Sequence, residues 1–440
     1  MLGLRRSLSG RGIGMHLLLV KLQTYLRNTV KPHERPALLV ASGYFFCVLA
    51  AYYIIRPVRD QSAAAAGSTQ LPVFYLAVLV ATLLMTPLFG ALAARFRRSQ
   101  FVPAVYAIVA VCTLAFIPLF SLGSRVSATA IGALFFVWGS VFNLLIVAVF
   151  WSFMADILDR EQARRLFPLI AVGGALGAIA GPAMTKGLVF VVGVQGLLVV
   201  SGALLGICIL CLYWLLGWAR RHPIAGEPDR DQRVIGGSIL AGAIETFRSP
   251  FLRRVALLML LGDCVGTVVY AFLVDYNRAM FPTREAGINF ASSLDLATNV
   301  LQIIFQLFLT REIMMRLGPI AALVLDGIVK AVMLLGLVAI GPGWIVVVAV
   351  VTRASAYGIF KPAADSLYTE VDAETRYKAK NFIDTAVWRF GDLAVTSALN
   401  LLRSVGVATA GLALMTAAAG AASAWVGSRM RKTLPGERSR

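Results

Sequence analysis

The chain alternates between long apolar runs and short polar breaks. A membrane-spanning helix needs about 20 mostly apolar residues, and the sequence contains twelve runs of this kind. They lie at 37–58, 71–94, 100–121, 128–155, 166–185, 188–218, 251–275, 289–310, 318–340, 343–369, 380–402 and 405–427. The pattern predicts an all-α membrane protein with twelve transmembrane helices.

A polar segment at 219–250 divides these runs into two sets of six. It predicts an N-terminal half at 37–218 and a C-terminal half at 251–427, joined by a central loop. A 6+6 plan is typical of major facilitator transporters, whose halves rock about a midplane site. The ends, 1–36 and 428–440, are polar and basic. The first of them holds either an amphipathic surface helix near 15–31 or a solvated tail.

The charge distribution predicts the orientation in the membrane. With both termini cytoplasmic, thirty Lys and Arg fall in the inner segments and seven in the outer ones. Inner loops are normally the basic ones, so we expect both ends inside, in a bacterial inner membrane. The net charge of +19 is then mainly a topology signal, and no nucleic-acid partner is expected.

Composition argues against an enzyme. Hydrophobic residues make up 59% of the 440 positions and charged ones 14%, against about 25% charged in soluble domains. The five Cys lie in apolar runs and the three His in terminal or loop segments, without metal-ligand or triad spacing. We expect no catalytic residue, metal or cofactor. The pair Cys208 and Cys211 is interpreted as structural.

Shifting the sequence by 214 residues aligns two cytoplasmic corners, each of which is a segment that runs from the end of a span through a charged turn. The shift aligns Ser152 with Ser366, Asp156 with Glu370, and Arg164 with Lys378. The match supports two pseudo-symmetric halves, although charged corners could also resemble each other without a repeat.

The segment 353–392 carries twelve charges in forty positions. Charges at membrane depth usually face a polar pathway. Arg353 lies about 14 Å into the tenth span, near the midplane. It either binds an anionic ligand or pairs with another helix, through Asp263 or a similar residue.

Further charges in this segment are spaced to share helix faces. At i, i+4 stand Lys361 with Asp365 and Lys380 with Asp384, and at i, i+3 stands Arg389 with Asp392. Such pairs can neutralise each other. The Lys380–Asp384 pair is interpreted as a gate, with a static helix-start pair as the alternative. The pair Asp326 and Lys330 in the ninth span is interpreted as packing.

The first span ends in Arg56-Pro57-Val-Arg59-Asp60. Pro57 is expected to kink or end the helix. The two guanidiniums suit phosphate or carboxylate, and the preceding tyrosines could stack on a base; the alternative is an interfacial anchor. In the fifth span Gly173, Gly174, Gly177 and Gly181 are spaced for close helix contact.

Three motifs carry a family resemblance. They are Tyr-Ile-Ile-Arg-Pro-Val-Arg-Asp at 53–60, the run from Phe142-Asn143 to Asp156, and the run from Arg376 to Asp392. They resemble the nucleotide (ATP/ADP) transporter family of plastids and intracellular bacteria, and more closely its homologues in other bacteria. The resemblance implies a major facilitator-like fold, nucleotide counter-exchange, and basic cavity residues that hold phosphates. Exchangers of host ATP carry lysine in the first motif, where this chain has arginine.

These observations together predict a secondary transporter with a central cavity lined by spans one, four, seven and ten. Its partners would be the bilayer and a small anionic solute such as ATP or ADP. The candidate substrate-binding residues are Arg56, Arg59, Asn143, Arg353 and Lys361. The candidate gating or coupling residues are Asp60, Asp156, Asp263, Asp365, Lys380, Asp384 and Arg389.

Two alternatives remain open from the sequence. One is a proton-coupled uptake or efflux transporter of the same fold, with Asp263 as the protonated carboxylate. The other is a membrane scaffold that transports nothing. Substrate, direction of transport and oligomeric state are not determined by the sequence.

Overall fold

The computed structural model describes residues 29–96, 98–121, 128–222, 239–371, 375, 379–380 and 382–430. The predicted surface helix near 15–31, half of the central loop (223–238) and the basic tail lie largely outside these residues. So do Arg376 and Lys378 of the repeated corner.

The first half consists of five long helices. Two short 3-10 turns, η1 (Pro32–Glu34) and η2 (Ser68–Gln70), flank the first of them. The long helices are α2 (Arg35–Ala66), α3 (Leu71–Arg95), α4 (Arg98–Ser121), α5 (Ala128–Ile157) and α6 (Arg160–Arg221).

The second half is also helical, and several of its spans contain a π-helical turn. Its elements up to the tenth span are α7 (Ile239–Arg248), α8 (Pro250–Met280), α9 (Arg284–Ile304), η4 (Phe305–Thr310), α10 (Arg311–Leu317), α11 (Pro319–Ile340), η5 (Pro342–Trp344), α12 (Ile345–Ser355), η6 (Ala356–Phe360) and α13 (Lys361–Leu367). The remaining elements are η7 (Tyr368–Glu370), η8 (Ile383–Val387), α15 (Trp388–Ser404) and α16 (Thr409–Arg429).

The helix α6 is two spans in one. Gly193 has φ +63°, a conformation that residues with a Cβ rarely adopt, and it breaks the 62-residue helix there. The predicted boundary at 186–187 was therefore about seven residues early. A polar Lys186 marked the break in the sequence, but the backbone turns only at the glycine.

Within the described residues, ten helices are long and apolar enough to cross a membrane. One of the ten is α6, which Gly193 divides. A further candidate is α15, which has 17 residues and is extended at its start by the five residues of η8. The structure therefore accommodates the twelve predicted spans, and the protein is an integral membrane protein.

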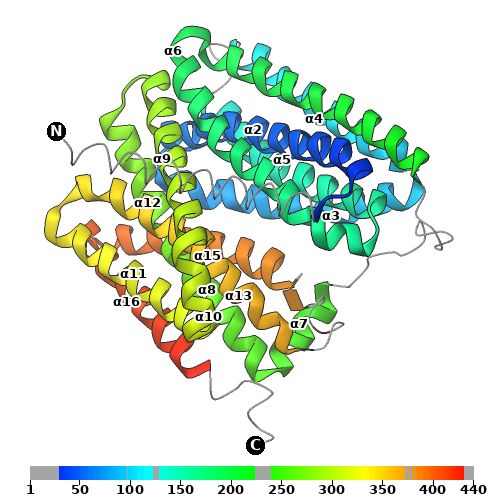
Figure 1. Cartoon of the computed structure of the whole chain (residues 1–440). Helices are drawn as coiled ribbons and strands as arrows, with labels where there is room; N and C mark the ends of the chain where they lie inside the picture. The colour runs from blue at the N-terminus through cyan, green and yellow to red at the C-terminus, as the bar shows by residue number, and fades with distance from the viewer. Residues whose placement is uncertain are drawn as a thin grey trace, which may run out of the picture.

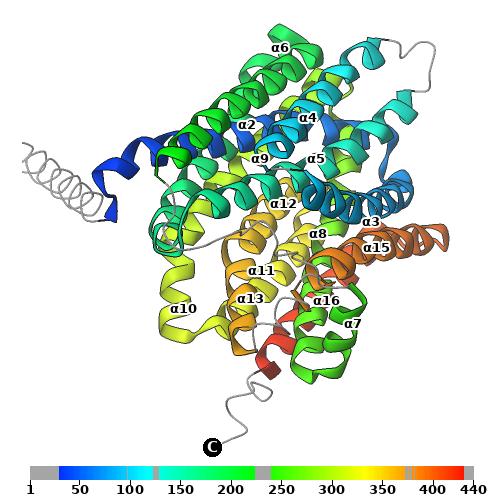
Figure 2. The ribbon, with the colours of Figure 1, turned by 90° about the vertical axis from the view of Figure 1, so that its right-hand side faces the viewer.

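The helices form two bundles. Figures 1 and 2 show the first half, blue to green, on one side and α11, α13 and α16, yellow to red, on the other. The bundles meet where α2 packs on α8 and α9, α6 on α9, and α3 on α15. A site between the halves must therefore be built from these helices.

Within the first half, glycines bring α6 against α2. A Cβ on Gly173 would lie 2.2 Å from the Ser42 carbonyl oxygen, and one on Gly177 would lie 2.3 Å from that of Phe46. Only glycine allows backbones to approach so closely. The interpretation of this run as close helix packing is confirmed.

The prediction that Pro57 could end the first helix is wrong. α2 continues to Ala66, and Pro57 is buried inside it. In membrane helices, neighbouring groups commonly compensate the hydrogen bond that proline removes. As a result Arg59 and Asp60 stay on the helix and point into the bundle, with only 14% and 12% of their side chains exposed. The alternative of an interfacial anchor is therefore wrong too.

Candidate substrate site

The two ends of the bundle are named from α2: the proximal end holds its start at Arg35, and the distal end its last residue, Ala66. The distal ends of α8 and α15 lie beside that of α2. There Arg403 of α15 donates to Asp275 of α8 at 3.0 Å, and Asp275 accepts from the Ser68 hydroxyl at 2.7 Å.

Both halves contribute charges to one group in the middle of the bundle, which we call the central cluster (Arg56, Arg59, Asp60, Asp295 and Arg353). Asp295 of α9 has a side chain only 1% exposed. Its Oδ1 accepts from Arg353 Nη2 at 2.7 Å, and its Oδ2 lies 3.6 Å from Arg56 Nε. One carboxylate thus connects a guanidinium of the first half with one of the second.

The rest of the cluster surrounds Asp60. Its Oδ1 accepts from Arg59 Nη2 at 2.7 Å and from the hydroxyl of Tyr270 on α8 at 3.1 Å. Arg56 Nε lies 3.9 Å from its other oxygen. Three guanidiniums and two carboxylates leave the cluster with one positive charge.

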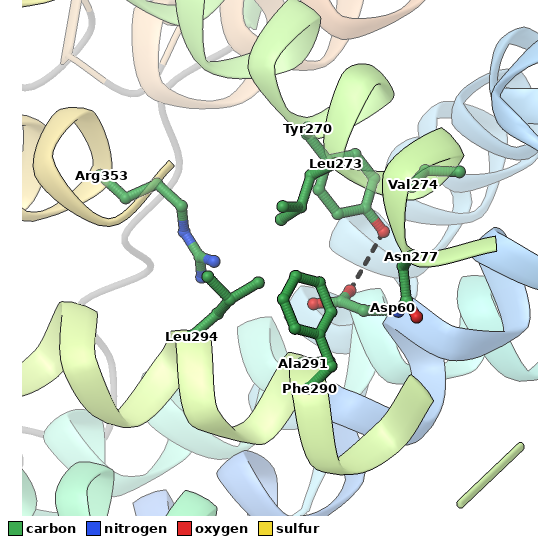
Figure 3. A pocket seen from close by; sticks show the side chains of 9 residues that line it. All are labelled: Asp60, Tyr270, Leu273, Val274, Asn277, Phe290, Ala291, Leu294 and Arg353. Carbon is green, nitrogen blue, oxygen red and sulfur yellow. Dashed lines mark hydrogen bonds between the residues drawn. The ribbon is translucent and has the colours of Figure 1, made fainter. Parts of the chain in front are cut away.

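A small hollow separates the cluster from the distal end. Figure 3 shows Arg353 and Asp60 at its sides, with the Tyr270 hydroxyl directed at Asp60. Its volume is about 10 Å³, which is room for about one water. Apolar side chains from α8 and α9, including Leu273, Phe290 and Leu294, fill the remaining space. No solute can pass the cluster on this side without movement of the halves.

Additional polar contacts join the halves at the distal end itself. The Asn400 amide on α15 donates to the Thr69 carbonyl at 2.8 Å, and Arg278 of α8 donates to the Ala66 carbonyl at 3.4 Å. With the Asp275–Arg403 group, they close the distal end in this structure.

Helices α2 and α5 support the arginines. The Tyr53 ring lies 5.4 Å from the Arg56 guanidinium. A Cβ on Gly139 of α5 would lie 3.2 Å from Arg59 Cδ, so α5 packs directly on that side chain. Asn143 lies half-buried one turn further along α5. Spans one and ten supply cluster residues as expected, and span seven contributes Tyr270 beside the cluster. Span four packs on Arg59 through Gly139, whereas the eighth span, α9, was missed.

Four charges form a second group, which we call the charge ring (Lys361, Asp365, Lys380 and Asp384). Lys361 Nζ lies 3.3 Å from Asp365 and 3.0 Å from Asp384, and Lys380 Nζ lies 3.4 Å from Asp384 and contacts Asp365. Both predicted i, i+4 pairs are present, and they also bond to each other. The ring therefore joins the tenth and eleventh spans within the second half.

On the distal side of the charge ring, charged residues of α15 pack against α8. Arg389 Nη1 lies 3.7 Å from Asp392, the predicted i, i+3 pair, and Thr267 of α8 donates to Asp392 at 2.9 Å. A Cβ on Gly391 would lie 3.0 Å from Asp263 Oδ2. Asp263 thus lies against α15 and does not partner Arg353. The interhelical bond considered for Arg353 is present, with Asp295 as the partner.

The structure also places Asp156 and the Asp326–Lys330 pair. Asp156 stands at the proximal end of α5. The Asp326–Lys330 pair is fully buried at 2.8 Å, and Asp326 also accepts from the Ser355 hydroxyl at 2.7 Å. The packing interpretation of that pair agrees with this geometry.

Sequence reasoning missed Asp295, although a signal for it exists. It is the only charged residue in the predicted eighth span, 289–310. A lone carboxylate at that depth needs a cationic partner, and Arg353 needed an anionic one. Matching the two would have found the pair.

A second, larger hollow lies elsewhere. It has a volume of about 460 Å³ and is lined mainly by apolar residues of α8, α11, α12 and α16, with Asp275 and Arg403 at one edge. All its lining belongs to the second half. Because it lies outside the contact between the halves, it is not the site expected for alternating access.

Comparison with known proteins agrees with this architecture. Residues 152–396 match the Major Facilitator Superfamily. The chain belongs to this superfamily, whose fold is that of membrane transporters.

Particular relatives are more distant. ADP,ATP carrier protein 1 of Chlamydia muridarum is 23% identical over 305 residues, which are 58% of this chain and 54% of that protein. That of Chlamydia pneumoniae is 22% identical over 326 residues, 63% and 62% of the two chains. The chain thus spans about half the length of the curated relatives it matches.

Solved structures share the fold. The nucleoside transporter NupG superposes with a TM-score of 0.63 at 14% identity, over 90% of this chain and 98% of that one. The POT family transporter PepTSo gives 0.62 at 14% identity, also over 90% and 98%.

Proposed function

We propose that the protein is a secondary transporter that exchanges an anionic, nucleotide-like solute of the ATP and ADP class by alternating access. The observation that carries the proposal is the convergence of Arg56 and Arg353, one from each half, on Asp295. A site held by both halves changes whenever they rock, which is what alternating access requires.

The chemistry of the central cluster supports an anionic solute. Guanidiniums bind phosphate oxygens in pairs of hydrogen bonds, and the cluster has a surplus of one positive charge. Tyr53 places an aromatic face beside Arg56, where a nucleobase could stack. The Chlamydia relatives are named as ADP,ATP carriers, and that similarity favours the nucleotide class over other anions.

We place the proximal end in the cytoplasm of a bacterium and the distal end outside, as the basic loops indicate. The structure then represents a carrier closed on the outer side. In this frame Arg56, Arg59, Asn143 and Arg353 contact the solute. Lys361 was expected to contact the solute; because it bonds within the charge ring, we instead propose that it acts in gating with its ring partners and with Arg389 and Asp156.

The test is exchange of labelled ADP for ATP in proteoliposomes. Arg353→Ala should reduce exchange at least about tenfold, because one bidentate phosphate contact is lost and Asp295 keeps its negative charge. Arg316→Ala is the matched control, since Arg316 is 79% exposed and, among the described residues, pairs with Glu312 in the same helix. Unchanged exchange in Arg353→Ala would contradict the site assignment.

A second candidate function is proton-coupled transport, and the position of Asp263 favours it. Its Oδ2 is buried and has no hydrogen-bond partner among the described residues, beside Gly391 and near Asp392. Uptake of a labelled solute driven by an imposed pH gradient, and abolished by Asp263→Asn, would support this candidate. Exchange that needs no gradient supports the nucleotide exchanger.

A further inference from the structure

Asp295 is bonded unequally on its two sides. Its Oδ1 makes a short contact with Arg353 in its own half, whereas Oδ2 stands 3.6 Å from Arg56 Nε of the other half. Both Oδ2 and Arg56 Nε are buried and lack a hydrogen-bond partner among the described residues. The bridge between the halves is therefore an electrostatic contact whose hydrogen-bonding capacity is unused.

Asp60 differs in this respect. Its Oδ1 is bonded by Arg59, its neighbour in sequence, and by Tyr270. Exchange of its partners would break two good hydrogen bonds. Of the two carboxylates in the central cluster, Asp295 is therefore the one that an incoming anion displaces from Arg56 at lower cost.

A phosphate group is a better partner for these guanidiniums than a single carboxylate. It brings more acceptor oxygens and more negative charge, and can satisfy Arg56 and Arg353 together. Both Arg56 and Arg353 keep some accessible surface, 15% and 17% of their side chains. An anion can thus reach the same groups that Asp295 now holds.

We infer that Asp295 is a positioning residue that serves as the internal anion of the site and makes translocation depend on a bound solute. Without solute, its carboxylate holds Arg56 and Arg353 together and keeps the halves from separating on the distal side. A bound anion takes over the guanidiniums and releases this restraint. The inference rests on the proposed function, because it assumes that the site accepts an anionic solute.

The consequence is strict exchange for solute that moves from the distal to the proximal side. A carrier whose empty form is held closed on the distal side by Asp295 reopens there only with another anion bound. Asp295→Asn keeps the size of the side chain but removes its charge, so the empty carrier becomes free to reorient. The variant should convert exchange into net flux.

The experiment uses proteoliposomes loaded with labelled ADP, in which the distal end of the carrier faces the lumen. Efflux is measured with and without unlabelled ADP outside. In the wild-type protein efflux should depend on external ADP, whereas in Asp295→Asn efflux without external ADP should rise at least about fivefold, the lower range of typical coupling between sites. The half-saturating ADP concentration should fall, because the competing carboxylate has gone.

A second variant, Arg56→Gln, should change the half-saturating ADP concentration in the opposite direction. Arg56→Gln also removes the bridge between the halves, so it too should allow efflux without external ADP. Its half-saturating ADP concentration should rise, because a phosphate ligand is lost. This pair of results keeps the inference testable if Asp295→Asn is poorly produced.

The control is Asp275→Asn, which removes a different ion pair of the distal closure. If Asp295 only held the halves together, Asp295→Asn and Asp275→Asn would change efflux to the same extent. Neither variant would then change the half-saturating ADP concentration. The inference would be overturned if Asp295→Asn showed the same dependence of efflux on external ADP and the same half-saturating ADP concentration as the wild-type protein. The proposed function would then still stand. Absence of any ADP or ATP exchange or binding by the wild-type protein would overturn both.

Discussion

At the scale of single residues, charges inside this bundle are stable because other side chains compensate them. Removing a buried charge from water is costly, and the cost is recovered only through close partners. The Asp326–Lys330 pair illustrates this, with side chains 0% and 2% exposed and an additional hydrogen bond from Ser355. The Lys330 ammonium also lies 4.9 Å from the Phe360 ring.

Replacement of Lys330 by alanine should destabilise the protein strongly. It leaves Asp326 buried without its cation, a change that typically costs about 3–5 kcal/mol. The midpoint of thermal unfolding in detergent should fall accordingly. Arg316→Ala breaks an exposed i, i+4 pair at 2.7 Å, where about 0–1 kcal/mol is expected. Equal midpoints for the two variants would contradict this account of the pair.

The other charged pairs show which contacts can be predicted from the sequence. The i, i+4 pairs Lys361–Asp365 and Lys380–Asp384 were predicted, because helix geometry alone places them on one face. Their joining into a ring was not, since it depends on how the tenth and eleventh spans are packed. For the same reason the interhelical alternative for Arg353 was proposed with Asp263 or a similar residue, and only the structure identifies Asp295 as that partner.

At the scale of elements, small residues and π-helical turns determine how the helices meet. The turn η6 stands between Arg353 and Lys361 in the tenth span. Such turns often occur at functional sites and shift the face that the following residues present. Residues after η6, including Lys361, therefore point in a different direction relative to Arg353 than they would on a regular α-helix.

Gly177→Ala tests the packing of α6 on α2. The added Cβ would lie 2.3 Å from the Phe46 carbonyl oxygen, so the two helices must separate along their whole contact. We expect a clear loss of thermal stability and of monodisperse protein on size-exclusion chromatography. Gly206→Ala, also on α6, meets nothing within 4 Å. It should be neutral or stabilising by about 0.5–1 kcal/mol.

If Gly177→Ala matched Gly206→Ala in both measurements, close contact would not be what the glycine run provides. The pairing of α6 with α2 would then have to rest on other contacts between them, such as the Ser201 hydroxyl of α6, which donates to the Ala51 carbonyl of α2 at 3.0 Å.

At the scale of the whole molecule, the two halves are joined by polar contacts in layers. The central cluster lies deepest, the small hollow of Figure 3 follows, and the group of Ser68, Asp275 and Arg403 lies at the distal end. Transport requires these layers to separate together, because the solute must pass all of them.

Loss of the outermost layer should shift the molecule towards opening on the distal side. Arg403→Gln removes the ion pair with Asp275, at 3.0 Å, and weakens the contact with Ser68. A cysteine placed at Leu294, which lines the hollow, should then react several-fold faster with a membrane-impermeant maleimide. The reagent is applied to the distal side.

Arg429→Gln, in the exposed proximal part of α16, is the control and should leave that reaction rate unchanged. The five native cysteines give the background, measured without the Leu294 substitution. A rate in Arg403→Gln no greater than in the control would show that this ion pair does not hold the distal end closed.

The sequence by itself determined the membrane class, the approximate spans, the two halves and the charged positions of α2, α12 and α15. It could do so because membrane thickness imposes span length and helix geometry imposes spacing. The tertiary structure decided that α2 passes through Pro57, that α6 turns only at Gly193, and that Asp295 joins the arginines of both halves. Those outcomes depend on how the helices pack in three dimensions, and span length and residue spacing along the chain do not determine that packing.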